Sequence, residues 1–457
     1  MSSPSGMDPR KTVPIDRRPD DALGSGGVSS SRRMPPGPAA PCHPSENIFH
    51  WINREFERFG GIFHASAYGG TIYVISDPQH VDHVLRVNWQ NYRKGFAVKR
   101  IEWLLGKGLM VSEGAFWKSQ RRMIQPAFHD EVIQTLMKVI VAVNEELLEK
   151  WKQAAREGAT VNVTTDISHM ILKIVLLSIF GEDYDQVASP FSILSDVSAR
   201  NLQFADAFRP LRRVVLEIAS RRQQANRDGA DFLGILLESR RRGDGGLMND
   251  IQLASEVMTL IVAGHETTAA TLAWVWFLLS ENPEAADKLA AELTSRSISQ
   301  PIAFADLSKF TWPRLVIEET LRLYPPGWLM TRKALHDDSL GEYFVPAGTE
   351  LYISPWLIQR NPAYWDEPTR FDPHRFDTEA SQSRHPMTMI PFSAGPRKCI
   401  GESFARLEMQ VHLIMIASVL RLTCLHSQQI ELDAGVNLRN KHDFIMLPQL
   451  RNESPEP

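Results

Sequence analysis

Residues 250–283, DIQLASEVMTLIVAGHETTAATLAWVWFLLSENP, constrain the fold more than any other part of the chain. Apolar residues recur there at three- and four-residue spacing, Asn249 or Asp250 is a candidate N-cap, and Pro283 stops the pattern. At 1.5 Å per residue, a helix of about 30 residues is about 45 Å long. A transmembrane span is the alternative, but the polar residues 265–268 lie at its middle, where lipid tolerates them least. The pattern therefore favours a central helix in a large folded core.

The remaining segments predict further helices and a few strands. Helical periodicity covers 113–181, 314–326 and 404–425, whereas alternation predicts a hairpin at 63–78 and short strands within 339–359. No linker or repeat interrupts the chain after its first 45 residues. We therefore expect a mainly α fold with a minor β portion, in a single large helix-rich domain with small sheets over 46–457.

The first 45 residues differ from the rest, because they are rich in Pro, Ser, Gly and Arg and contain no apolar run. This composition predicts a disordered leader over 1–45, with neither a signal peptide nor a membrane anchor. The net charge of −4 does not favour a nucleic-acid partner. Three cysteines in 457 residues are too few for a disulfide framework and fit a reducing compartment. We expect a cytoplasmic monomer.

One of these cysteines, Cys399, lies in the unusual stretch PFSAGPRKCIG (391–401). Arg397 and Lys398 place positive charge beside the thiol, and Gly395 and Gly401 allow tight backbone turns around it. Zinc would need further Cys or His ligands at short spacing, and an iron–sulfur cluster would need four cysteines. A heme needs one thiolate, because the porphyrin supplies the other four ligands. The alternative is that Cys399 is a small buried hydrophobe.

The central helix carries a small and polar face. At helical spacing this face contains Leu260, Ala263, Gly264, Thr267 and Thr271. Glycine costs about 1 kcal/mol relative to alanine within a helix, so a flat ligand or a closely packed helix should gain from Gly264. Thr267 is also expected to donate a hydrogen bond to the Ala263 carbonyl and to distort the helix locally.

Five motifs together resemble those of the cytochrome P450 family. In FSAGPRKCIG the matching residues of the heme-binding loop are Phe392, Gly395, Arg397, Cys399 and Gly401. The other four motifs follow the family's order in the chain: WKSQRR (117–122), AGHETT (263–268), the Glu-x-x-Arg of 319–322 and PTRFDPHRF (368–376). The resemblance extends from about residue 45 to the end.

The resemblance implies a soluble, bacterial-type heme-thiolate monooxygenase. Such an enzyme inserts one oxygen atom from O2 into a lipophilic small molecule, by hydroxylation or epoxidation. It implies heme b with Cys399 as the axial ligand of the iron, Thr267 as the proton-relay residue and Glu266 as its acid partner. Glu319, Arg322 and Arg375 are assigned a structural role in holding the cysteine loop. The expected heme-binding residues are Trp117, Arg121, Arg332, Phe392, Gly395, Arg397, Gly401, Ala263 and Gly264.

The family also implies an apolar substrate pocket and separate redox partners. The expected substrate is a terpenoid, a steroid or a fatty-acid-like molecule, although segment 63–76 offers no Arg or Lys to hold a carboxylate. Since no flavin or nicotinamide domain is present, NAD(P)H is expected to act through a ferredoxin or flavodoxin and its reductase. The cationic cluster of Arg93, Lys94, Lys99, Arg100 and Lys107 is interpreted as solvated surface, with a site for an acidic substrate as the alternative. The expected pocket residues are Phe96, Leu104, Ala263, Trp328, Leu329, Met330 and Phe444.

Two alternative functions stay open at this point. The first is a peroxide-using or isomerising heme-thiolate enzyme on the same fold, against which the adjacent Glu266 and Thr267 argue. The second is a non-catalytic heme-binding protein.

Overall fold

The computed structural model describes most of the chain after the N-terminal segment. The described residues are 33–43, 46–67, 70–195, 203–227, 229–242, 248–296, 301–377, 383–425 and 430–451. Most of the expected leader, 1–32 and 44–45, thus lies outside the described residues.

Residues 33–43 correct the expected leader boundary at residue 45. Pro36 accepts a hydrogen bond from the His64 backbone N–H at 2.9 Å, and the Cys42 N–H donates to the Ser66 carbonyl at 3.0 Å. The Pro-rich composition masked this contact, because the segment is held by backbone groups rather than by an apolar face of its own.

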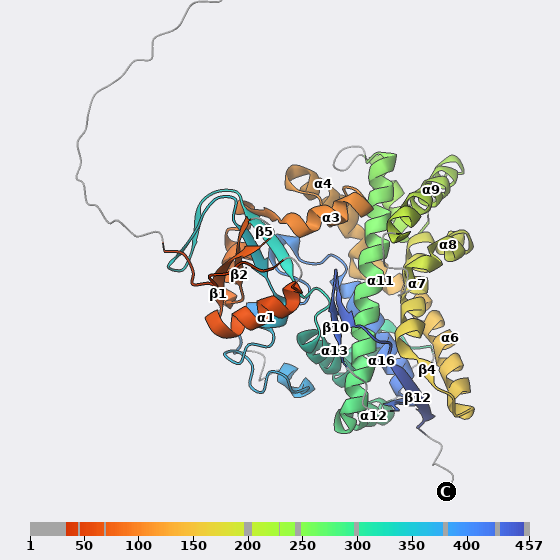
Figure 1. Ribbon diagram of the computed structural model, residues 1–457. Helices are drawn as coiled ribbons and strands as arrows, with labels where there is room; N and C mark the ends of the chain where they lie inside the picture. The colour runs from red at the N-terminus through yellow and green to blue at the C-terminus, as the bar shows by residue number, and fades with distance from the viewer. Residues whose placement is uncertain are drawn as a thin grey trace, which may run out of the picture.

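The fold is mainly helical, as the sequence predicts. Helix α11 runs through the middle of the molecule, with α6, α7, α8 and α9 on one side of it and the small sheet of β1, β2 and β5 on the other (Figure 1). The helices are α1 (Ile48–Phe59), α2 (Pro78–Asp82), α3 (Phe96–Leu105), α4 (Gly114–Ile124), α5 (Asp130–Thr135), α6 (Met137–Arg156), α7 (Val163–Phe180), α8 (Tyr184–Phe191), α9 (Gln203–Gln224), α10 (Phe232–Arg242), α11 (Asp250–Glu281), α12 (Pro283–Ser295), α13 (Trp312–Leu323), α14 (Pro355–Ile358) and α16 (Glu402–Ala417).

The strands form small sheets at the edges of this helical body. The largest has the order β1-β2-β8-β5-β3, and a three-stranded sheet has the order β4-β12-β9. Strands β10 and β11 form one hairpin, and β6 and β7 form another. The strands are β1 (Ile62–Ala67), β2 (Gly70–Ile75), β3 (Tyr92–Lys94), β4 (Val161–Asn162), β5 (Met330–Ala334), β6 (Asp338–Leu340), β7 (Tyr343–Val345), β8 (Glu350–Ile353), β9 (Leu420–Cys424), β10 (Leu432–Ala434), β11 (Leu438–Asn440) and β12 (Ile445–Leu450).

Helix α11 forms where its periodicity predicts. The Asn249 side chain accepts the Gln252 backbone N–H at 2.9 Å and so caps the first turn. Pro283 begins α12 after a break at Asn282. Helix α11 packs along α7 and also contacts α13 and α16. Most of its side chains are buried, as expected for a central helix.

Within the described residues, one helical stretch is long and apolar enough to cross a membrane. It is Val163–Ser195, with a mean hydropathy of 1.6, and 72% of its most apolar window is buried inside the protein. Its apolar side chains therefore serve the core, where α7 packs against α11.

The last predicted helix, 404–425, is too long. Helix α16 ends at Ala417, and residues 420–424 form β9, which pairs with β12 in antiparallel register. The alternation of buried and partly exposed side chains in Leu420–Cys424 is the two-residue period of a strand. The periodicity of the preceding helix obscured it.

Candidate active site

A cavity of about 430 Å³ lies between α11 and the cysteine loop, within the usual range for small-molecule sites. Cys399 of the cysteine loop, Thr267 of α11 and Arg332 of β5 all line it. The structure thus brings together residues that are far apart in the chain.

The loop around Cys399 is held by its own backbone. The Cys399 N–H donates to the Phe392 carbonyl at 2.9 Å, and the Lys398 N–H donates to the Gly395 carbonyl at 3.0 Å. Gly395 has a φ of +69°, and a Cβ there would lie 2.0 Å from the Leu85 carbonyl oxygen. Gly395 is therefore required for close packing against residues His83–Val87, and it does not line the cavity as expected for a heme-binding residue.

Cys399 is a free, exposed cysteine that lines the cavity. Burial and the nearby charge of Glu402 raise the pKa of its thiol, whereas the Gly401 N–H, Arg121 and Lys398 act to lower this pKa. Each of these three groups stabilises a thiolate, the form that binds a metal ion. Phe392 and Gly401 also line this part of the cavity.

Five cations among the described residues line the cavity: Lys94, Arg121, Arg332, Arg397 and Lys398. Arg397 lies over the Trp117 ring, with its guanidinium carbon 3.8 Å from the ring centroid, and its side chain pairs with Glu113. Trp117 lines the cavity beside it.

Arg121 and Arg332 each donate a hydrogen bond to a backbone carbonyl group. Arg121 donates to the Lys398 carbonyl at 2.7 Å, and Arg332, which is 8% exposed, donates to the Thr331 carbonyl at 3.0 Å. Burial, with the nearby charge of Arg397, lowers the pKa of Arg332 to about 10. These charges are desolvated and lack a full counter-charge.

Lys94 is a further buried cation in this part of the cavity. The sequence analysis did not predict that it lines the site. It lies directly opposite Arg332 in the antiparallel pair of β3 and β5. Its ammonium group donates to the Leu109 carbonyl at 3.1 Å and to the Met110 carbonyl, and burial lowers its pKa to about 7. Like charges opposite one another in a sheet are destabilising, so this wall is built for an anionic ligand. The donor set fits a group with two carboxylates, and Cys399 fits an iron ligand.

The small face of α11 lines the cavity as predicted. Leu260, Ala263, Gly264, Thr267 and Thr271 all contribute to it. The Thr267 hydroxyl donates to the Ala263 carbonyl at 2.8 Å, which confirms the expected back-bond. A Cβ on Gly264 would lie 3.4 Å from a Val175 methyl group, an ordinary contact. Helix packing alone therefore does not require this glycine, and a ligand against the helix is the better explanation.

Glu266 lies between two cavities. It lines the large cavity with Thr267 and also a smaller one of about 40 Å³, together with Ser168, Arg439 and Asn440. A volume of about 10–15 Å³ holds one water molecule. The smaller cavity is therefore large enough for a short water chain behind Glu266.

Among the expected substrate residues, Ala263 and Met330 line the cavity. Phe96 is instead 49% exposed at the start of α3. The side chain of Leu104 lies outside the described residues. The large apolar side chains of 96–104 did not show which of them point into the cavity.

Trp328 and Leu329 belong to another apolar cluster, and Phe444 lines the smaller cavity beside Glu266, so none of the three lines the large cavity. The Trp328 indole donates to the Gly435 carbonyl at 3.1 Å, and Leu329 packs on the same cluster. Phe444 stacks on Phe277 with ring centroids 5.0 Å apart. Each of these predictions is corrected by a packing partner that is distant in sequence.

Apolar lining residues from α3, α7 and α11 were missed. Their signal was the apolar helical periodicity of these segments, which shows an inward face but not what it faces. They are Ile101, Leu105, Val175, Ile179 and Val262.

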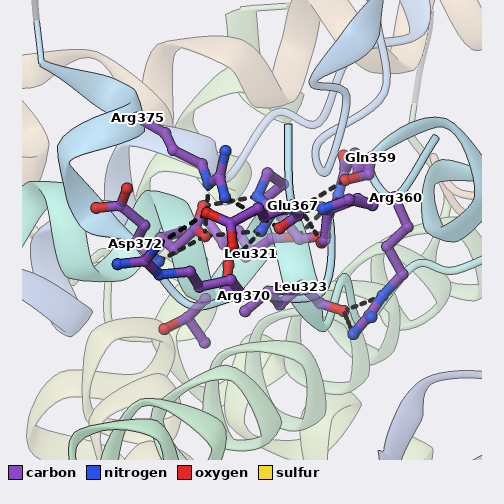
Figure 2. Close-up of polar contacts among 12 residues, drawn as sticks. Leu321, Leu323, Gln359, Arg360, Glu367, Arg370, Asp372 and Arg375 are labelled. Atoms are coloured by element: carbon purple, nitrogen blue, oxygen red, sulfur yellow. Dashed lines mark hydrogen bonds and ion pairs between the residues drawn. The ribbon is translucent and has the colours of Figure 1, made fainter. Parts of the chain in front are cut away.

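The residues assigned to structural support form a buried ion network. Arg322 makes two hydrogen bonds to the Glu319 carboxylate, at 2.6 and 2.7 Å, and both side chains are fully buried. Arg375 approaches the same carboxylate at 3.5 Å. The Asp372 N–H donates to the same carboxylate at 2.9 Å. Figure 2 shows Arg375 and Asp372 within this network of polar contacts. The three predicted members are thus in contact.

The cavity is lined by the Cys399 thiol, by several partly buried cations and by the polar residues in the middle of α11. This combination is the one that a heme-thiolate site requires. The family model for cytochrome P450 matches residues 40–214 and 204–445. This chain belongs to the cytochrome P450 family.

The similar proteins agree with this assignment. Cyclooctatin synthase and cyclooctat-9-en-7-ol 5-monooxygenase of Streptomyces melanosporofaciens are 32% and 30% identical to it, over 77% of this chain and 80% of theirs. Carotene epsilon-monooxygenase of Arabidopsis thaliana is 28% identical, over 87% of this chain and 80% of its own. The crystal structure of the cytochrome P450DA heme domain has the same fold, with a TM-score of 0.79 and 23% identity over 92% of this chain and 98% of that one.

The chain is therefore a cytochrome P450 monooxygenase that uses heme iron and O2. Its family implies a lipophilic substrate and a redox partner. The alternative of a non-catalytic heme-binding protein is set aside.

Proposed function

We propose that this enzyme hydroxylates or epoxidises a neutral, terpenoid-like molecule, with electrons from NAD(P)H delivered through a ferredoxin or flavodoxin and its reductase. The observation that carries the substrate class is the distribution of charge around the large cavity. All cations among its described lining residues come from β3, α4, β5 and the cysteine loop. The lining from α3 and α7 is apolar.

This distribution disfavours a substrate with a free carboxylate. A buried carboxylate without a cationic partner costs several kcal/mol, and the cations present lie where the heme carboxylates would bind. The names of three relatives point the same way, since carotene is a terpenoid hydrocarbon and cyclooctat-9-en-7-ol is a neutral alcohol.

The residues that would take part in the reaction lie on helix α11 and in the cysteine loop. Cys399 would hold the iron, and Lys94, Arg121, Arg332 and Arg397 would hold the heme carboxylates. Bound heme supplies the activation of O2. Thr267 donates to Ala263, so its oxygen remains free to accept a hydrogen bond from within the cavity. Glu266 lines both cavities, and in this proposal it would pass protons from the smaller cavity toward Thr267.

A matched pair of ligands tests the substrate class. The holoprotein is titrated with a diterpene alcohol and with the carboxylic acid of the same skeleton, and binding is followed by the spin-state shift of the Soret band. We expect the alcohol to bind at least about tenfold more tightly, equal to about 1.4 kcal/mol. Tighter binding of the acid would overturn the assignment to neutral substrates.

The electron source is tested in parallel. Product is expected with NAD(P)H, ferredoxin or flavodoxin, and reductase, and not with hydrogen peroxide alone. Turnover with peroxide and none with the redox proteins would support the peroxide-using alternative instead.

A further inference from the structure

The loop that joins α3 to α4 forms one side of the large cavity. It comprises residues 106–113, of which Leu109 and Met110 line the cavity. Leu109 is only 8% exposed, although loops usually run over the protein surface. A buried loop needs partners for its backbone N–H and C=O groups. The residues that supply these partners therefore decide where this side of the cavity lies.

The loop supplies only part of these partners itself. The backbone N–H groups of Val111 and Ser112 both donate to the Gly108 carbonyl at 3.0 Å. The Leu109 N–H instead donates to a carboxyl oxygen of Glu256 on α11, at 2.7 Å. Glu256 is fully buried, and within the described part of the chain no group donates to its second oxygen. The contact with Leu109 thus gives this buried acid its role in the fold.

Glu256 differs from Glu319, whose carboxylate is paired with Arg322 and Arg375. Burial raises the pKa of Glu256 to about 8, whereas the Leu109 N–H and the charge of Lys94 act to lower this pKa. Because the pKa lies above neutral pH, the side chain is mostly an uncharged acid there. It therefore serves as a hydrogen-bond acceptor, and an amide could replace it in this role.

The loop also approaches α11 closely at Gly108. A Cβ on Gly108 would lie 2.2 Å from the Thr259 hydroxyl oxygen and 2.8 Å from the Ser255 carbonyl oxygen. Glu256 and Thr259 are three residues apart on α11 and so share one face of the helix. Thr259 itself lines the large cavity. The loop is thus held against the same helix that carries Thr267.

Two cations of the cavity hold the carbonyl groups of the same loop. The Lys94 ammonium donates to the Leu109 carbonyl at 3.1 Å and to the Met110 carbonyl. The Arg397 guanidinium donates to the Ser112 carbonyl at 2.8 Å. Leu109 is consequently held through its N–H by α11 and through its carbonyl by β3.

We propose that Glu256 is a positioning residue that fixes Leu109 and Met110 as one side of the large cavity, and that it thereby determines how tightly the enzyme holds ligands that extend to this side. Without the acceptor, the Leu109 N–H would stay buried without a partner, and the loop would gain freedom. A ligand that packs on the loop must then order it, which weakens binding. The inference rests on the proposed function, because it takes this cavity as the substrate site.

Hydrogen exchange tests the position of the loop without turnover. Exchange of the backbone amides of 106–113 is followed by mass spectrometry in the holoproteins of wild type, Glu256→Leu and Glu256→Gln. We expect the Leu109 amide to exchange about tenfold faster or more in Glu256→Leu, because leucine keeps the bulk but not the acceptor. Glu256→Gln keeps an acceptor oxygen and should exchange as wild type does. Equal exchange in wild type and Glu256→Leu would overturn the proposal.

Two azoles of different length test the effect on the cavity. Imidazole and N-dodecylimidazole bind heme iron through the same ring, and the shift of the Soret band measures both affinities. We expect Glu256→Leu to weaken the binding of N-dodecylimidazole by about fivefold or more, and to leave imidazole unchanged, since only the longer ligand extends along the cavity. Glu256→Gln should bind both as wild type does. Equal weakening of both azoles, or an unchanged preference, would overturn the proposal.

A second set of variants guards these tests. Glu281→Leu, an exposed change at the end of α11, is the matched control and should behave as wild type. If Glu256→Leu fails to fold, Glu256→Asp decides the question, because it withdraws the acceptor by one methylene group. Faster exchange at Leu109 with weaker binding of the longer azole supports the proposal, and unchanged values overturn it. Both measurements need bound heme but no turnover, so a failure of the proposed function, seen as absent product, remains distinguishable.

Discussion

The side-chain oxygen of Gln359 accepts the backbone N–H of Ile390 at 3.0 Å, just before the cysteine loop. The amide nitrogen of the same side chain donates to the Leu321 and Arg322 carbonyls, at 2.9 and 3.1 Å. One buried glutamine thus joins the end of α13, which carries the Glu319–Arg322 pair, to the segment that presents Cys399.

Replacing Gln359 with Leu should loosen this connection. The change leaves buried backbone groups without partners, which costs about 1–3 kcal/mol each. We expect a lower urea midpoint and a smaller fraction of protein with the thiolate-type carbon-monoxide band. Gln134→Leu, on the exposed face of α5, is the control. A Gln359 variant as stable as this control would show that the connection contributes little.

The axial ligand should be identified by the carbon-monoxide difference spectrum of the reduced protein. We expect a thiolate-type Soret band in wild type that Cys399→His abolishes. Cys42→Ser and Cys424→Ser remove thiols that lie outside the large cavity, so both should retain the band. Retention of the band by Cys399→His would mean that the cysteine loop is not the site.

Thr267→Ala should uncouple electron transfer from product formation. The variant loses a hydroxyl that lines the cavity and is held by the Ala263 carbonyl. We expect a fall of about tenfold or more in product per NAD(P)H consumed, with matching release of peroxide. Thr294→Ala removes the same kind of back-bond from an exposed position on helix α12 and serves as the control. Unchanged coupling in Thr267→Ala would remove Thr267 from the relay.

Acid should weaken the protein partly through Asp338. Burial alone would raise the pKa of Asp338, but hydrogen bonds from Tyr92 and His83, with others from the backbone and Asn88, lower it to about 2. Because the folded pKa lies below the unfolded value of 3.8, the stabilisation is complete above that value and is lost as the pH falls through about 2.

Asp338→Asn should therefore cost about 1–2 kcal/mol at pH 7 and progressively less toward pH 2. Urea unfolding across this pH range measures the difference. Asp287→Asn removes an exposed partner of Arg421 and should leave the acid limb unchanged. A pH-independent difference for Asp338→Asn would argue against this origin.

The sequence predicts the helical core and the chemistry of the site better than the shape of the pocket. Cys399, Thr267 and the Glu319–Arg322 pair occur within short motifs, so local spacing identifies them. Trp328 does not line the large cavity and Phe444 lines only the smaller one, because any large aromatic side chain can stack in a core and only the tertiary fold decides which neighbours it meets.

The residues that were missed have the same physical cause. Lys94 has the sequence context of a surface cation until β3 pairs with β5, and Val175 and Ile179 have that of ordinary core residues until α7 packs against α11. Both depend on contacts between distant segments, which periodicity alone does not specify.

The pairing of Lys94 with Arg332 ties the amount of folded protein to the supply of heme. Two facing cations penalise the chain until an anionic group lies between them, so the ligand adds its binding free energy to a fold that is weakened without it. Chains made faster than heme is supplied should unfold more often and be removed by proteases. The cell's heme supply would then set how much of this enzyme persists, with no dedicated regulator.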